Sequence, residues 1–267
     1  MKIGIAGNGF LDQPLKDALK SVRSLSAHGF GLFLNGEEDL PEIKELFDEN
    51  EIEITCVGVL GNPRVRNRTE NIIQVIHAAK SLGVSRVNTY FANTQTADEQ
   101  SAVVQYVEMV RPCVLAAQDS GITLLMENEL SLQPGNVSKS PELCIRVLEG
   151  VSSPHFKLTY DPANFYVSGA ADFQQVYKNF REHIGHVHLK DVDRVNSELS
   201  QANPENRVWS GWDGEYICLA LGEGLMPVEQ ILQWLKTDGY DGYLMLEPFE
   251  NLAPYKEGID CLRAIGV

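Results

Sequence analysis

Short apolar runs alternate with helical stripes of apolar residues along the whole chain. The strand-like runs occupy residues 2–6, 30–34, 52–60, 84–91, 122–127, 156–161, 184–189 and 242–247. Between them, apolar residues recur with helical spacing, as in Leu15, Ala18, Leu19 and Val22 after the first run. Eight such repeats without a compositional break predict a closed (β/α)8 TIM barrel over residues 1–267 as a single domain. An open, doubly wound sheet is the alternative.

One connection departs from this rhythm. Residues 191–226 separate the seventh strand from its helix, whereas such connections usually have about two to six residues. We expect a long active-site loop there, because long loops at the carboxyl face of a barrel usually cover a substrate. Trp209 or Trp212 should then lie over the barrel mouth, and Arg194 should point into it. A solvated insertion with structural aromatics is the alternative.

Composition and charge narrow the class of partner. The net charge of −15 and the pI near 4.8 disfavour a nucleic acid, whose phosphates would be repelled. No run has the length of a membrane helix, and the opening MKIGIAGNGF lacks the basic and long apolar regions of a signal peptide. Widely spaced cysteines among apolar residues indicate reduced core thiols in a cytoplasmic protein: Cys56, Cys113, Cys144, Cys218 and Cys261.

Polar residues gather at the ends of four predicted strands. Glu127, Asp161 and Glu247 each end an apolar run, and IGHVHLKD at 184–191 places His186 and His188 on one strand face with Lys190. A lone strand histidine is usually a hydrogen-bonded core residue. Four polar strand ends are a poor core, however, and a parallel barrel would bring them together as a site for a divalent cation.

Five motifs carry a family resemblance. They are MEN at the end of the fifth strand, DPAN after the sixth, GHVHLKD at the seventh, LGEG before the next helix, and GYDGYLMLEPF at the eighth. Together they resemble the xylose isomerase-like barrels, a group of sugar isomerases, epimerases, inosose dehydratases and barrel AP endonucleases. The resemblance covers residues 120–250. It implies that Glu127, Asp161, His188 and Glu247 ligate one divalent cation, and that both glutamates also serve as acid and base.

Two positions depart from one branch of this family. In ketose 3-epimerases an acid, a histidine and an arginine bind the substrate. The corresponding positions in this chain are Gln133, Asn164 and Arg194. Only the arginine matches, which puts the free-ketose substrate class in question. The third and fourth strands also lack the additional histidines of the AP endonucleases, which argues against a nuclease.

Three carboxylates and an imidazole suit Mn²⁺ or Mg²⁺, with Co²⁺ or Zn²⁺ as alternatives. A bound divalent ion leaves this cluster near a net charge of −1, so we expect Lys190 or Arg194 nearby. His186 lies deeper, as a core residue or a support for the site. The candidate substrate contacts are Asn164, Lys190, Arg194, His186 and Trp212.

These residues favour a metal-dependent isomerase or epimerase that acts on a small sugar or keto-sugar by proton transfer through an enediolate. The alternative is a metal-dependent lyase of the inosose dehydratase or 3-keto sugar type. A non-catalytic carbohydrate-binding barrel ranks third, because binding alone would not need two potential bases at positions 127 and 247. Such barrels are often homo-oligomers, so we expect a dimer or tetramer.

Overall fold

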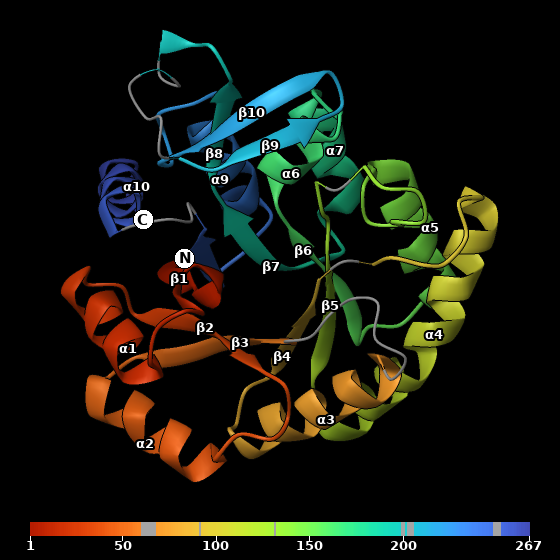
Figure 1. Ribbon diagram of the computed structural model, residues 1–267, viewed down its shortest axis with the longest axis horizontal. Helices are drawn as coiled ribbons and strands as arrows, with labels where there is room; N and C mark the ends of the chain where they lie inside the picture. The colour runs from red at the N-terminus through yellow and green to blue at the C-terminus, as the bar shows by residue number, and fades with distance from the viewer. Residues whose placement is uncertain (60–67, 91, 131, 199–200, 202–205, 248–251) are drawn as a thin grey trace.

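The computed structural model describes residues 1–59, 68–90, 92–130, 132–198, 201, 206–247 and 252–267. Within them, parallel strands close into a barrel in the order β1-β11-β7-β6-β5-β4-β3-β2, with helices around the outside (Figure 1). The barrel strands are β1 (Lys2–Ala6), β2 (Gly29–Leu34), β3 (Glu53–Val59), β4 (Arg86–Thr89), β5 (Thr123–Glu127), β6 (Phe156–Tyr160), β7 (Ile184–Leu189) and β11 (Tyr243–Leu246). The prediction of a single (β/α)8 barrel is confirmed.

The helices follow the predicted apolar stripes. They are η1 (Gly7–Phe10), α1 (Leu15–Ser24), α2 (Leu40–Asn50), α3 (Arg68–Ser81), α4 (Glu99–Ser120), α5 (Pro141–Val151), α6 (Pro162–Val167), α7 (Phe173–Phe180), α9 (Val228–Thr237) and α10 (Leu252–Ala264). The expected strand ends at Leu60 and Phe91 lie outside the described residues. No helix in the described part of the chain combines the length and apolar character that a membrane crossing requires.

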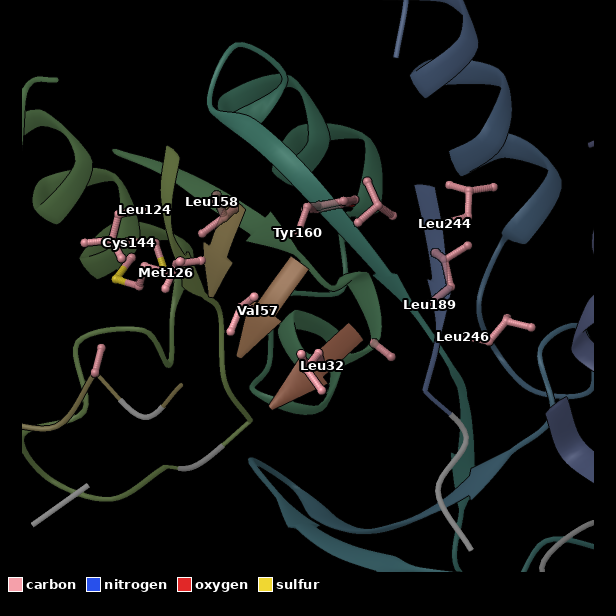
Figure 2. Packing of buried hydrophobic residues seen from close by; sticks show 14 of the residues in the cluster. Leu32, Val57, Leu124, Met126, Cys144, Leu158, Tyr160, Leu189, Leu244 and Leu246 are labelled. Carbon is pink, nitrogen blue, oxygen red and sulfur yellow. The ribbon is translucent and has the colours of Figure 1, made fainter. Parts of the chain in front are cut away.

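The two faces of the strands have different roles. Val187 and Leu189 of β7 point outward and join the core between strands and helices, where they are almost fully buried. Each such side chain contributes about 1.5–3 kcal/mol through burial. Figure 2 shows buried side chains of strands far apart in the sequence, among them Leu32, Leu158 and Leu244, in this core. The opposite face of each strand is therefore free to carry polar residues into the barrel.

The segment 191–226, expected as a loop, forms an antiparallel sheet in its described part. The sheet has the order β8-β10-β9, with β8 (Asp191–Arg194), β9 (Val208–Gly211) and β10 (Gly214–Leu219), and it projects beyond the barrel (Figure 1). Trp212 and Asp213 form the short hairpin turn between the paired Gly211 and Gly214. The Asp-Gly pair in GWDG is typical of hairpins, so the sequence itself carries a signal for this turn.

Asp191 anchors this sheet to the barrel. Its side chain is buried, and its carboxylate accepts hydrogen bonds from the backbone N–H groups of Val192, Gly222 and Met226. The LGEG turn therefore closes around the last residue of the HVHLKD motif. This gives the long segment a fixed position above β7.

Candidate active site

Four side chains converge at the carboxyl ends of β5, β6, β7 and β11. Glu127, Asp161, His188 and Glu247 each offer one ligand atom, and these atoms lie within 4.8 Å of one another. All four residues are buried, with at most 3% of their surface exposed. Their convergence follows from the parallel barrel, which brings the ends of strands separated by up to 120 positions to one rim.

Each carboxylate has one oxygen held by an N–H donor. Asn88 donates to Glu127 Oε2 at 3.0 Å, the backbone N–H of Asn164 donates to Asp161 Oδ1 at 2.9 Å, and Asn8 donates to Glu247 Oε1. The Asp161 contact is also the N-cap of α6, so the start of that helix orients the carboxylate. The second oxygen of each carboxylate faces the shared centre.

Two potential cations lie among these free oxygens. His188 Nδ1 is 3.2 Å from Glu127 Oε1 and 3.5 Å from Glu247 Oε2. Lys190 Nζ is 2.7 Å from Asp161 Oδ2 and 2.8 Å from Glu247 Oε2. Lys190 is thus the nearby cation that the charge of the cluster required.

The electrostatics of the cluster follow from burial and these pairs. Burial disfavours the charged His188 ring, but Glu127 and Glu247 outweigh it and raise the pKa of His188 to about 10. Burial acts to raise the pKa of Glu247, but Lys190 and His188 outweigh it and lower that pKa to about 2. For Glu127 burial dominates over the attraction of His188, so the pKa of this carboxyl is raised. The two glutamates are therefore inequivalent.

A further acid, the half-buried Glu129, lies beside the cluster. Burial, followed by the charge of Glu127, raises the pKa of Glu129 well above its ordinary value. Its backbone N–H donates to the carbonyl of Ser138. Glu129 is a second residue in MENE with an environment unlike that of a surface carboxylate.

Two asparagines fasten β5 to the start of α6. Asn128 donates to the Asp161 carbonyl at 2.7 Å and accepts from the Asp161 N–H at 2.9 Å. Asn164 donates its side-chain N–H to the Asn128 carbonyl at 2.8 Å. The MEN and DPAN motifs thus form one hydrogen-bonded unit that fixes Glu127 relative to Asp161.

Aromatic rings line the rim. Tyr90 stacks on Phe33 with centroids 5.3 Å apart and lies 6.5 Å from the ring of His188. Trp209 of β9 is 8% exposed, and its ring centroid is 5.5 Å from Lys190 Nζ. One face of the antiparallel sheet therefore reaches the cluster through Trp209.

The other candidate substrate contacts lie in different surroundings. His186 is buried with its ring 5.5 Å from that of His188, and its Nε2 has no hydrogen-bond partner among the described residues. The guanidinium of Arg194 pairs with Asp213 at 2.6 and 2.8 Å and lies 4.4 Å from the centroid of Tyr216, so the expectation that it points into the site is wrong. The sheet register explains this pairing, because Arg194 lies opposite Tyr216 and Asp213 is in the hairpin turn three residues before Tyr216.

The position of Trp212 also differs from the expected one over the barrel mouth. It is 67% exposed at the hairpin turn, and its ring packs over Gly169. Trp209, three positions earlier, is the tryptophan beside Lys190, because side chains alternate along β9 and only one face of the sheet turns toward the barrel. Trp209 therefore replaces Trp212 as the aromatic candidate for substrate contact.

Sequence reasoning also missed Asn8 and Asn88. Both lie at or near the carboxyl ends of barrel strands, which is the signal that identified the four cluster residues. Neither carries an ionisable group, so neither stands out in the sequence as a candidate metal ligand. Asn88 also accepts a hydrogen bond from Thr159, so it links β4, β5 and β6.

The donor set suits a divalent cation. Three oxygens and one imidazole nitrogen face a common centre, and the outer oxygens of the carboxylates are oriented by N–H donors, as is usual for metal ligands. Within the part of the chain that the structure describes, Asn8 Oδ1 and Asn164 Oδ1 are buried without a hydrogen-bond partner. Such acceptors beside the cluster suit hydroxyl groups of a bound molecule.

Comparison with known proteins agrees with this fold. Residues 20–265 match the model of the xylose isomerase-like TIM barrel family, and the chain belongs to that family. The uncharacterized protein MJ1311 of Methanocaldococcus jannaschii is 24% identical, over 92% of this chain and 83% of its own length.

Solved structures share the fold at low sequence identity. A D-tagatose 3-epimerase-like protein has a TM-score of 0.76 at 20% identity, over 99% of this chain and 97% of its own. The probable 3-DHS dehydratase AsbF of Bacillus anthracis has a TM-score of 0.74 at 19% identity, over 98% of this chain and 99% of its own. A xylose isomerase-like TIM barrel protein of Mycobacterium smegmatis in complex with magnesium has a TM-score of 0.76 at 17% identity, over 99% of this chain and 96% of its own.

Proposed function

We propose that this protein is a divalent-metal-dependent isomerase or epimerase of a small sugar or keto-sugar. The observation that carries the proposal is that Glu127 Oε1 and Glu247 Oε2, from two different strands, lie 3.2 and 3.5 Å from His188 Nδ1, so that both carboxylates face the shared centre. Glu127, Asp161, His188 and Glu247 hold the cation, with Mn²⁺ or Mg²⁺ favoured by the oxygen-rich set. When bound, the ion supplies a Lewis acid that stabilises negative charge on substrate oxygens.

The two glutamates then transfer the proton. One carboxylate removes it from the carbon beside the carbonyl, which gives an enediolate, and the other returns a proton. Return to the opposite face of the same carbon is epimerisation, and return to the neighbouring carbon is isomerisation. The proposed substrate contacts are Asn164, Lys190 and Trp209. His186 lies deeper in the barrel and supports the site through its contact with the ring of His188.

A dehydratase is the second candidate, and Lys190 is the observation that favours it. Its ammonium lies 2.8 Å from Glu247 Oε2 and can hydrogen bond to the oxygen of a departing hydroxyl group. The paired state of Arg194 also removes the one match to the ketose 3-epimerase grip. In a lyase one glutamate would act as the base, and the substrate would lose a molecule of water.

Proton NMR of a panel of sugars, keto-sugars and inososes in D₂O with Mg²⁺ separates these functions. Solvent deuterium at a substrate carbon supports the isomerase or epimerase, and loss of water with new unsaturated product supports the lyase. Binding of a sugar without exchange or elimination would instead indicate a carbohydrate-binding barrel. Full activity after exhaustive chelation would contradict the metal dependence.

A further inference from the structure

The ammonium of Lys190 forms ion pairs with two carboxylate oxygens that a metal would need. Nζ lies 2.7 Å from Asp161 Oδ2 and 2.8 Å from Glu247 Oε2, and the side chain is 2% exposed. The other oxygens of these carboxylates, Asp161 Oδ1 and Glu247 Oε1, already accept from the Asn164 N–H and from Asn8. Lys190 and a metal ion therefore require the same two oxygens.

The two cations cannot both hold these oxygens without strong repulsion. A small divalent ion lies about 2.1 Å from a ligand oxygen, so an ion on both oxygens would lie within about 4 Å of an ammonium that also kept both. In a site shielded from water, charges at that separation interact strongly. The ring of Trp209, 5.5 Å from Nζ, offers the ammonium a favourable direction in which to move.

We propose that Lys190 is an internal competitor of the metal ion. Before the metal binds, its ammonium neutralises Asp161 and Glu247 and keeps them together. When the metal binds, the ammonium leaves at least one of the two oxygens and turns toward Trp209 and the substrate. Lys190 therefore weakens metal binding, and metal occupancy positions an N–H donor for a substrate oxygen. This inference rests on the proposed metal-dependent function.

The test is calorimetric titration of chelator-treated protein with Mn²⁺. We expect Lys190→Met, which keeps the length of the side chain without its charge, to lower the Kd at least about tenfold. Lys190→Arg keeps the charge and should stay within about threefold of the wild type. Lys157→Met is the matched control. Lys157 lies near the start of β6, at the opposite end of that strand from Asp161, and its Nζ donates to the Glu182 carbonyl. The Kd of this variant for Mn²⁺ should equal the wild-type value.

The outcomes separate this inference from the proposed function. An equal or higher Kd for Lys190→Met, with Mn²⁺ bound by the wild type, overturns the competition and leaves the metal site standing. A wild-type protein that binds no divalent ion overturns both. If the methionine variant does not fold, a crystal structure of the wild type with Mn²⁺ decides. Nζ bonded to both Asp161 Oδ2 and Glu247 Oε2 beside the ion refutes the proposal, and loss of either bond supports it.

Discussion

Replacing Glu127 or Glu247 by glutamine preserves the shape of the side chain but removes its ability to accept a substrate proton. The surroundings can accommodate each amide. Asn8 Oδ1 has no partner among the described residues, so a turn of the Asn8 amide lets it accept from glutamine at 247. At 127, the Asn88 amide can turn in the same way, because the Thr159 hydroxyl that donates to it can also accept.

The expected loss is in the chemical step. Turnover at saturating metal should fall by about 10²–10⁴, or roughly 3–5 kcal/mol of transition-state stabilisation. Metal affinity should fall much less, because an amide oxygen still faces the centre and Asp161 and His188 are unchanged. Glu247 faces both Lys190 and His188, whereas Glu127 faces only His188. Glu247→Gln should therefore destabilise the metal-free protein more, by roughly one charge-assisted hydrogen bond of 1.5–3 kcal/mol.

The assay compares kcat for each variant at a metal concentration that saturates that variant in its own titration. Glu53→Gln is the control, because Glu53 bonds to Tyr243 and Lys2 near the amino end of β3, and it should retain full activity. In an epimerase the variant that retains the base for one epimer can still exchange that epimer's proton with solvent. Near wild-type turnover in either active-site variant, with metal bound, would mean that this glutamate is only a ligand and that the two-base mechanism is wrong.

Three further predictions concern the metal site. Asn88→Leu removes the donor to Glu127 Oε2, so metal affinity should fall about 10–100-fold in a Mn²⁺ titration, and an unchanged Kd would refute the orienting role. The pKa of His188 is raised to about 10, so its charge stabilises the metal-free protein fully below about pH 6.5. This contribution, on the order of 5 kcal/mol, is lost as the pH rises through 10. Urea unfolding should show that decline in the wild type and a smaller one in His188→Gln. A divalent ion at about 100 times its Kd should add about 2.7 kcal/mol and raise the Tm by roughly 5–10 °C, reversed by a chelator, and an unchanged Tm would count against the site.

The period-two pattern in IGHVHLKD determined on its own that Val187 and Leu189 face the core while His186, His188 and Lys190 face the barrel interior. The eight strand and helix repeats determined the barrel, and the barrel placed the ends of four strands on one rim. These features were readable because hydrophobic periodicity depends on neighbouring residues, and because parallel closure leaves few alternatives for the strand ends.

The tertiary structure alone decided which neighbours complete the site. Asn8 and Glu247 are 239 positions apart, and their hydrogen bond depends on the closure of β1 against β11, which no local pattern encodes. The hairpin in the segment 191–226 likewise placed Trp209 beside Lys190, left Trp212 exposed at the turn, and paired Arg194 with Asp213. Lys190 was expected near the cluster, but its position on the oxygens that a metal would need follows from the reach of one flexible side chain among three fixed carboxylates. Such contacts depend on side-chain geometry across the barrel, so the sequence could name the cluster but not the ion pairs within it.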